Sequence, residues 1–350
     1  MNPRFEARAL EGGAVAPPFL LAARRARRMR HGLLLVALAL AGAGVLALAL
    51  ALGSVRLSAS EVWQALLAGK GTVAGDIVWQ LRLPRALAAF GTGAALALAG
   101  CLMQVLLRNP LADPYVLGAS GGAAVAALGA MLLGFALPMQ QAMAFIGALF
   151  SVALVFQLGR GDGSWSHGRL LLTGVVVAAG WGALITLLLA LAPDAQLRGM
   201  LFWLIGDVSA AEGAWLTALA ALLALGFSLP LGRDLNLLSR GELLATTLGL
   251  SVARLRWLVY ALASLLTAAA VSTAGAVGFV GLLVPHLLRL GLGGDHRLLV
   301  PACLLGGGAY LTLADTLART LLAPRQLPVG ALTALVGVPL FLALLRRGRV

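Results

Sequence analysis

The stretch from Leu33 to Leu52 reads LLLVALALAGAGVLALALAL and is built from leucine, alanine, glycine and valine alone. A helix needs about 20 apolar residues to cross the hydrocarbon core of a bilayer. This segment is long enough to span, and no small-residue cleavage site stands out after it, so it does not resemble a signal peptide. The sequence therefore predicts a membrane-spanning helix near the amino terminus.

The rest of the chain repeats this pattern. Of its 350 residues, 61% are hydrophobic and 11% charged, and the mean hydropathy is +0.96. A soluble protein of this length would need more polar residues to cover its outside. We therefore predict an all-α, polytopic membrane protein. Apolar runs between charged or Pro/Gly-marked breaks predict about ten spans, of which the eighth is short and broken, at 33–52, 86–106, 115–134, 140–158, 170–191, 213–231, 257–276, 279–292, 298–318 and 330–345.

The distribution of basic residues predicts the orientation. If the amino terminus is inside, 19 of the 26 Lys and Arg residues lie on the inner side, as the positive-inside rule favours. Both termini are then cytoplasmic, with a basic, poorly ordered tail over residues 1–30 and a membrane domain over residues 31–350. The net charge of +13 is spread over membrane-flanking loops, which indicates contact with anionic lipid and not with nucleic acid.

Two segments interrupt the apolar pattern in a similar way. RNPLADPYVLG (108–118) carries two prolines, and GFVGLLVPHLLR (278–289) carries two glycines and a proline. Glycine and proline positions recur at an offset of 175 residues, which suggests two inverted halves, as in many transporters. Backbone groups freed by these residues must be covered by protein or line a cavity. We therefore predict broken helices beside a pathway, at Asn109, Pro110, Asp113, Pro114, Gly278, Gly281, Pro285 and His286, with Asn109 and Asp113 capping helix ends.

The chemistry that the sequence lacks limits its function. Asp315 and His286 are the clear ionisable residues within spans, and Asp315 lies four residues before Arg319, where an intrahelical ion pair is the simplest account. Lys70 in AGKGT lacks the glycine spacing of a phosphate-binding loop, so ATP hydrolysis is not expected on this chain. Cys101 and Cys303 lie inside apolar spans, so we predict no disulfide, metal site or cofactor. A proton-coupled carrier remains the alternative, followed by an intramembrane serine protease using Ser120 and His286.

The segment LNLLSRGELLATTLGLSVARLR (235–256) is mildly polar but contains its own apolar pattern. Ser239 and Glu242 have the spacing of a capping box, so a helix should begin near Arg240 and end at Gly249, and Ser251 can cap the next helix. Leucines 243, 244 and 248 give the short helix an apolar face. This face either lies on lipid headgroups or docks in the groove of a partner protein.

Several motifs in order resemble the permease subunits of bacterial ABC importers for ferric siderophores, haem and vitamin B12, the FecCD-type family. They are residues 81–122, LNLLSRGELLATTLG (235–249), GFVGLLVPHLLR (278–289), ADTLAR (314–319) and LPVGALTALVGVPLF (327–341). The resemblance implies a type II importer fold in the bacterial inner membrane. It also implies a homodimer of permeases, two cytoplasmic ATPase subunits and a periplasmic substrate-binding protein. Gly275-Ala276 stands where many members have Gly-Pro, and Arg240 where a leucine is usual.

The resemblance also assigns roles to residues at the two ends of the spans. It implies that the 235–249 helix couples to the ATPase through Leu238, Arg240, Gly241, Glu242, Leu244, Ala245, Leu248 and Gly249. It implies that Arg82, Arg85 and Arg319 meet at the periplasmic rim and bind acidic residues of the binding protein. Snorkelling to headgroups is the alternative for these arginines. Iron chelate, haem and cobalamin stay equal as cargoes.

Overall fold

A computed structural model describes residues 18–53, 55, 57–159, 167–209 and 214–346, and all regular elements in those ranges are helical. Ten of the helices correspond to the ten predicted spans: α2 (Pro18–Ala51), α5 (Leu83–Leu106), α6 (Ala119–Leu132), α7 (Leu137–Gly159), α8 (His167–Leu191), α10 (Ala214–Ser228), α13 (Val252–Ala274), α14 (Val280–Leu292), α15 (His296–Thr320) and α16 (Val329–Arg346). The shorter elements are α3 (Ala59–Ala68), α4 (Val73–Asp76), the π-helical turn η1 (Ile77–Arg82), the 3-10 turn η2 (Pro114–Leu117), α9 (Asp194–Ile205), α11 (Gly232–Ser239) and α12 (Glu242–Thr247).

Length and composition support a protein that crosses the membrane many times. Within the described ranges, seven helices are long and apolar enough to span, and α10 with α11 forms an eighth candidate that is bent by 75°. The shorter apolar helices α6 and α14 complete the ten predicted spans. The sequence did not predict α3, α4 or α9 as separate helices, because each is too short to give a span signal.

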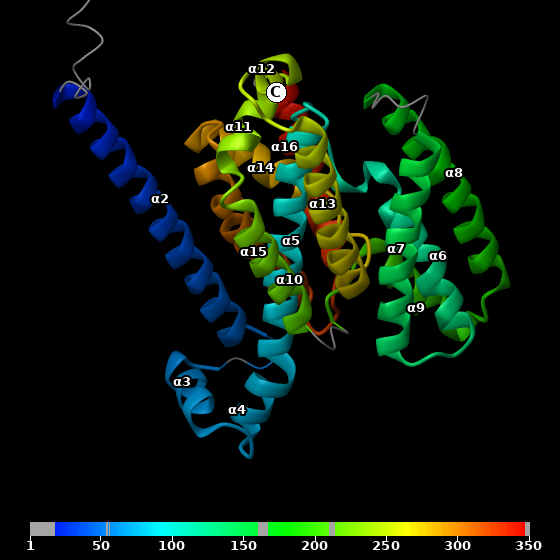
Figure 1. The fold of residues 1–350 in the computed structure, drawn as a ribbon. Coiled ribbons are helices and arrows are strands. Elements are labelled where there is room, and N and C mark those ends of the chain that lie inside the picture. Colours follow the sequence, from blue (N-terminus) through cyan, green and yellow to red (C-terminus); the bar gives the residue numbers. More distant parts are fainter. Residues whose placement is uncertain (1–17, 54, 56, 160–166, 210–213, 347–350) are drawn as a thin grey trace, which may run out of the picture.

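Helix α5 is the centre of the bundle, between α15, α13, α10 and α14 (Figure 1). Close approach there depends on glycine. A Cβ atom built on Gly93 would lie 2.2 Å from the carbonyl oxygen of Gly307, and one on Gly307 would lie 2.3 Å from that of Gly93. Small residues let α5 and α15 pack backbone to backbone, which is a common source of stability between helices in lipid.

The prediction of a poorly ordered tail over residues 1–30 is wrong for residues 18–30. Residues 1–17 lie outside the described ranges, but residues 18–30 form the first turns of α2. After Pro18 the sequence contains no glycine or proline until Gly32, and Ala, Leu, Arg and Met are strong helix formers. The basic segment therefore extends the first span as one continuous helix. The amino-terminal end of this helix stands apart from the other helices of the bundle (Figure 1).

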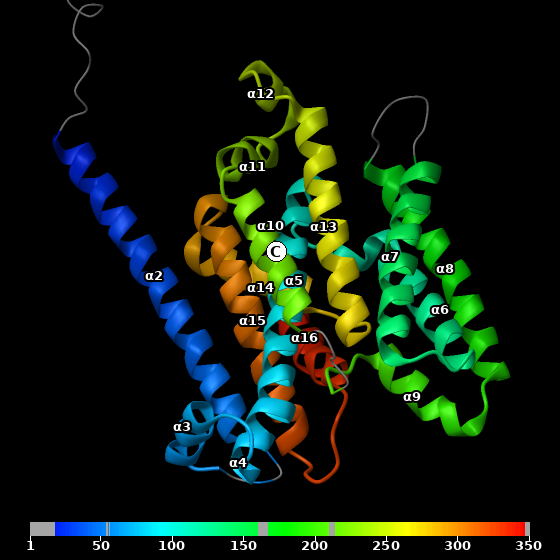
Figure 2. The ribbon, with the colours of Figure 1, turned by 60° about the horizontal axis from the view of Figure 1, so that its bottom comes forward.

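The two halves of the chain repeat in helix length, although not at the predicted offset. The series α5, α6, α7 and α8 has 24, 14, 23 and 25 residues, and the series α13, α14, α15 and α16 has 23, 13, 25 and 18. Helices α5 and α13 run in opposite directions (Figure 2). The short second helix of each series follows a left-handed residue, Gly118 (φ 73°) and Phe279 (φ 67°). The repeated glycines and prolines at 175 residues therefore do not mark equivalent positions.

Candidate functional site

One candidate site is the α11–α12 segment at the end of the molecule where α13 begins (Figure 2). Gly241, with φ 124°, separates the two short helices, and Gly249, with φ 80°, ends the segment. Leucines 243, 244 and 248 of this segment are 80%, 44% and 60% exposed. The segment thus presents an apolar face away from the bundle, as expected from the sequence.

Glu242 fixes this tip to the body of the protein. Its carboxylate pairs with the guanidinium of Arg256 on α13, and its Oε1 lies 3.3 Å from Nη2 of Arg108, in the turn after α5. Arg108 has φ 48°, a left-handed conformation that is uncommon for a residue with a side chain. Arg108 and Arg256 were not predicted as site residues, because nothing in the local spacing of the sequence indicates that three distant segments meet at one carboxylate.

The predicted capping box is wrong. Helix α12 begins at Glu242, behind Gly241, and Ser239 is the last residue of α11. The hydroxyl of Ser239 donates to the carbonyl of Asn236 at 2.9 Å. Ser251 precedes α13 but its side chain makes no capping hydrogen bond there. The left-handed turn at Gly241 separates Ser239 from the amides that it would cap.

Two predicted coupling residues face inward. Leu238 is 1% exposed and Ala245 is fully buried, so both pack against the protein's own helices. Arg240 lies exposed between the two short helices. Leu243, which was predicted on the apolar face but not among the coupling residues, is more exposed than Leu244. The periodicity of a helix with only six residues is too short to show which face is buried.

A second polar link holds α11 in place. The side chain of Asn236 donates to Oδ1 of Asp295 at 2.8 Å and accepts from the backbone amide of His296 at 2.9 Å. Asp295 caps the start of α15 through the backbone amide of Arg297. The α11–α12 segment is therefore connected to α15, α13 and the end of α5, which are the central helices of the bundle.

The two proline- and glycine-containing segments meet each other at α5. A Cβ atom on Gly281 would lie 2.6 Å from Cδ of Pro114 and 2.9 Å from the carbonyl oxygen of Leu96. One on Gly100 would lie 1.8 Å from the carbonyl oxygen of Gly281. The prolines and glycines predicted breaks in both segments, and the tertiary structure brings the two segments into contact.

The side chains at these breaks have local structural roles. Asp113 caps η2 by accepting from the amide of Tyr115 at 2.8 Å, as predicted. Asn109 caps no helix. Its side chain instead accepts from the amide of Leu111 at 2.9 Å and stabilises the turn around the exposed Pro110.

Half of the eight residues predicted at these breaks are buried within this chain, and their role in a pathway stays a prediction. Pro114, Gly281, Pro285 and His286 are buried inside the bundle. The His286 ring packs edge-on against Phe341 of α16, with 6.4 Å between ring centroids. Gly278 is partly buried. The freed backbone groups are covered by protein, the other outcome that a lipid environment permits.

The three predicted docking arginines gather at the opposite end of the bundle. Arg82, at the end of η1, is 4% exposed and donates to the carbonyl oxygens of Leu50, Ala51 and Val55. Arg319 of α15 donates to the carbonyl oxygen of Ala49. The last carbonyls of a helix have no partner within it and carry partial negative charge. The two arginines therefore cap the carboxyl end of α2.

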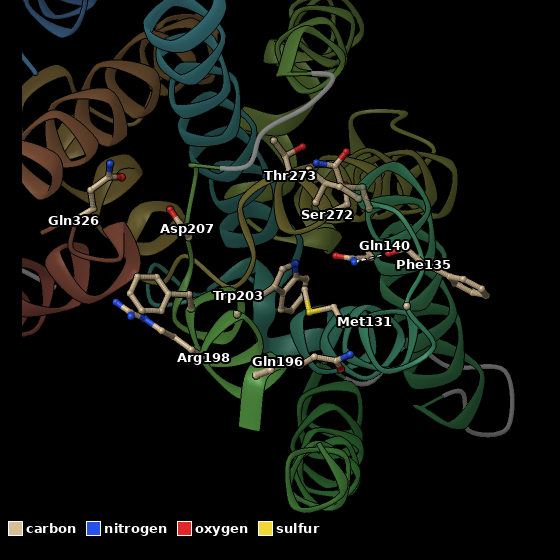
Figure 3. A pocket seen from close by; sticks show the side chains of 16 residues that line it. Met131, Phe135, Gln140, Gln196, Arg198, Trp203, Asp207, Ser272, Thr273 and Gln326 are labelled. Atoms are coloured by element: carbon tan, nitrogen blue, oxygen red, sulfur yellow. Dashed lines mark hydrogen bonds between the residues drawn. The ribbon is translucent and has the colours of Figure 1, made fainter. Parts of the chain in front are cut away.

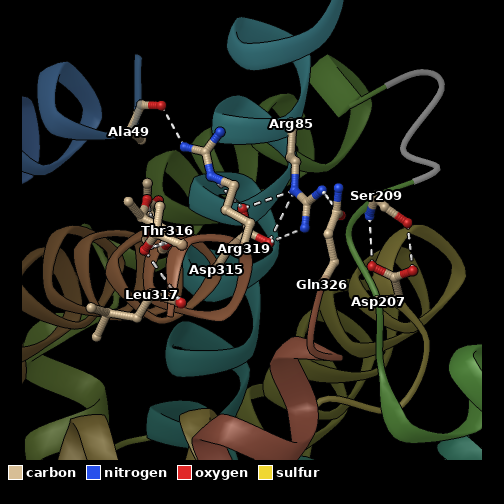
Figure 4. Close-up of polar contacts among 11 residues, drawn as sticks. Ala49, Arg85, Asp207, Ser209, Asp315, Thr316, Leu317, Arg319 and Gln326 are labelled. Atoms are coloured by element: carbon tan, nitrogen blue, oxygen red, sulfur yellow. Dashed lines mark hydrogen bonds and ion pairs between the residues drawn. The ribbon is translucent and has the colours of Figure 1, made fainter. Parts of the chain in front are cut away.

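Arg85 provides the main partner of the buried Asp315. Its Nη2 lies 2.8 Å from Oδ1 of Asp315, and its Nε lies 3.0 Å from Oδ2 (Figure 4). The predicted intrahelical pair is longer, at 3.9 Å between Nε of Arg319 and Oδ2. Arg85 also donates to Oε1 of Gln326 at 2.7 Å. The carboxylate thus joins α5 to α15, a long-range pairing that helical spacing does not reveal.

Two cavities open near this end. The smaller, of about 340 Å³, is lined by Arg82, Arg85 and Arg319 together with Gln326 and neighbouring residues. The larger, of about 770 Å³, shares Gln326 and lies between α9, the α6–α7 turn and the end of α13. Its lining combines aromatic, amide, hydroxyl and two charged side chains, including Trp203, Phe135, Gln140, Gln196, Ser272, Thr273, Arg198 and Asp207 (Figure 3).

No group of three His, Cys, Asp or Glu side chains comes together as a metal site within the described part of the chain. Cys101 and Cys303 are free thiols, and both are buried. The larger cavity is lined by aromatic side chains and by side chains that can form hydrogen bonds.

About ten apolar helices around a glycine-packed centre, with an anchored apolar tip at one end, define a polytopic helical membrane protein. The chain belongs to the FecCD transport family, whose sequence profile matches residues 24–347. It is 41% identical over 313 residues to the hemin transport system permease protein HmuU of Yersinia pestis, covering 85% of this chain and 90% of that protein. It is 38% identical to the vitamin B12 import system permease protein BtuC of Klebsiella pneumoniae, covering 94% of this chain and 96% of that protein.

The fold agrees with a solved relative. An inward-facing conformation of a metal-chelate type ABC transporter superposes with a TM-score of 0.78 at 34% identity, covering 90% of this chain and 99% of that chain. The family is one of transport permeases and not of enzymes, which argues against the serine protease alternative.

Proposed function

We propose that this chain is the membrane-spanning subunit of an ATP-driven importer that moves a metal chelate into the cytoplasm. Two copies would form the pathway, with two separate ATPase subunits on the α12 side and a substrate-binding protein on the side of the arginine cluster. Both termini would then be cytoplasmic. The relatives named above for hemin and vitamin B12 support the class of cargo.

The observation that carries this proposal is the exposed leucine face of an anchored helix. The α12 segment holds Leu243, Leu244 and Leu248 outward, while Ala245 and the Glu242 ion pairs fix its other side. An apolar face on a rigid support can transmit a force from a bound partner, whereas a loose loop absorbs it. Tilting α12 would move α13 and the end of α5, since both are tied to Glu242.

The test uses charge on this face. Leu243→Asp and Leu248→Asp should abolish co-purification with the cognate ATPase, because each buries an unpaired carboxylate in the contact. Thr246→Asp, at an exposed polar position of the same helix, is the matched control and should assemble normally. Normal assembly and ATP-driven uptake in both leucine variants would contradict the coupling role.

The arginine cluster is proposed to receive acidic residues of the binding protein. In this structure the guanidinium of Arg85 is already paired with Asp315, so a carboxylate of the binding protein must compete with Asp315. Asp315→Asn should therefore tighten docking of the binding protein at low salt, and the gain should disappear at high salt because of screening. Unchanged or weaker docking at low salt, in a variant that remains folded, would argue that these arginines only stabilise the permease itself.

The cargo is proposed at the level of its chemistry, as a large chelate whose metal is held by its own organic ligand. The aromatic and amide lining of the 770 Å³ cavity, with no metal-binding cluster among the described residues, suits contact with the organic periphery. Uptake of hemin, cobalamin and ferric siderophores by the complete complex in proteoliposomes would distinguish the three. Uptake of the free metal ion alone would contradict the proposal.

A further inference from the structure

We propose that α3 is an interfacial anchor, which lies in the headgroup region of the bilayer and inserts Trp63 and Leu67 among the lipids. This inference does not depend on the cargo or on the ATPase. It rests on how the side chains of α3 divide around the helix axis and on where the helix lies.

The surface of α3 has three distinct sectors. Val62 and Ala65 are buried against the protein, and the indole of Trp79 donates to the carbonyl oxygen of Ala65 at 3.0 Å. Trp63 and Leu67 are 63% and 71% exposed and lie one turn apart, so they form one apolar stripe. This stripe is separate from the buried one, and the protein's own packing leaves it uncovered.

The third sector of α3 is polar and charged. Glu61 lies on the side of the helix away from the Trp63–Leu67 stripe, and Gln64 lies between Glu61 and the stripe. The carboxylate of Glu61 accepts from the backbone amide and the hydroxyl of Ser58, both at 2.7 Å. The backbone bond is the main cause of a lowered pKa at Glu61, so this side stays ionised and hydrated. A helix with one wet side, one apolar side and one packed side is suited to lie along an interface.

The position of α3 identifies what covers the apolar stripe. The helix follows directly after the first span and contacts the end of α2 (Figure 1). Only 17% of the most apolar part of α2 is buried within the protein, so most of this helix is free to face lipid. The stripe on α3 therefore continues a surface that already faces the bilayer, at the depth where that surface reaches water.

The residue types in α3 and directly after it are typical of the membrane–water interface. Tryptophan is enriched at membrane–water interfaces, where the ring contacts acyl chains and the indole N–H reaches polar groups. The exposed Lys70 follows the helix, and its ammonium group suits the phosphates of lipid headgroups. Anchoring α3 would hold the connection between α2 and Arg82 at a constant depth in the membrane while the other helices of the bundle move.

The test measures which solvent each face of α3 meets. Nitroxide labels at Trp63→Cys, Leu67→Cys and the control Gln64→Cys are compared in nanodiscs of phosphatidylethanolamine and phosphatidylglycerol. The fully buried Cys101 and Cys303 should not react, which labelling of the unaltered chain checks. Labels at 63 and 67 should collide mainly with oxygen, which concentrates in lipid, and the label at 64 mainly with a water-soluble nickel chelate.

Two results would overturn the anchor. If labels at 63 and 67 meet the nickel chelate as readily as the label at 64, the stripe faces water. If they are protected from both agents, a second permease copy covers the stripe. Repeating the measurement with the binding protein present and absent identifies that protein as the cover if protection appears only when it is bound.

Discussion

The carboxylate of Asp315 sets how three arginines are arranged at one end of the molecule. It forms a two-point pair with Arg85 and a longer contact with Arg319. Arg319 and Arg82 are then available to cap α2. A single acidic residue thus links α15 to α5 directly, and to α2 through the arginines. The charge of Asp315 therefore affects contacts among α2, α5 and α15, and not within α15 alone.

For this residue, Asp315→Asn should lower the stability of the isolated permease. Removing one partner of a buried ion pair costs about 3–5 kcal/mol, because the remaining charge stays buried without compensation. The melting temperature of the purified protein should fall clearly in the variant. Asp194→Asn, at an exposed site in the first turn of α9, should lower it far less, because only a surface charge at a helix start is lost. The double variant Asp315→Asn with Arg85→Gln should recover part of the loss, and no recovery would show that Arg85 is not the main partner.

Helices α5 and α14 approach each other so closely that only glycine fits at their contact. Gly100 and Gly281 bring their backbones together beside Pro114, at the point where both halves of the chain break. Such contacts give helices in lipid a source of stability that apolar burial cannot supply. They also fix the position of the short helix α14 relative to the centre of the bundle.

For these two helices, Gly100→Val should prevent correct packing of α14. Its Cβ atom would lie 1.8 Å from a backbone oxygen, which cannot move without displacing the helix. We expect the free energy of unfolding to fall by more than the roughly 1–3 kcal/mol that ordinary overpacking costs. Size-exclusion profiles and thermal unfolding in detergent measure it. Gly180→Ala in α8, where a Cβ atom meets nothing within 4 Å, is the matched control. A Gly100→Val protein as stable as the control would contradict the close contact between α5 and α14.

For the whole molecule, the two candidate surfaces lie at opposite ends of the spans. The α11–α12 tip is at one end, and α3, α4 and the arginine cluster are at the other (Figures 1 and 2). A transporter that is driven from one side and loaded from the other needs this separation. The central helices α5, α13 and α15 connect the two ends, so a change at one can reach the other through rigid elements.

The orientation of the whole molecule can be tested by labelling from each side. A membrane-impermeant maleimide added to the periplasmic side should modify Gln64→Cys on α3 and should not modify Leu248→Cys beside α12. After the membrane is opened, both should react, since both positions are exposed. The opposite pattern would reverse the topology and the assignment of the two partner surfaces.

Local composition was enough to establish the class of structure. Runs such as Leu33–Leu52 can only be placed in lipid, so the number of spans and the all-helical fold follow from the residues of each segment. The exposed leucines of α12 and the cap at Asp113 were predictable for the same reason, because neighbouring residues decide them. The motifs from Leu81 to Gly122 and from Gly278 to Arg289 further indicated the family.

Which distant residues meet was settled by the packing of the bundle. Arg85 with Asp315, Glu242 with Arg108 and Arg256, and Pro114 with Gly281 join segments whose spacing in the sequence carries no sign of contact. Packing also turned Leu238 and Ala245 inward and separated Ser239 from the cap that it was predicted to form. Local patterns report the preference of a residue for lipid, water or a turn. They do not report how helices are rotated against each other, because that rotation is set by contacts across the whole bundle.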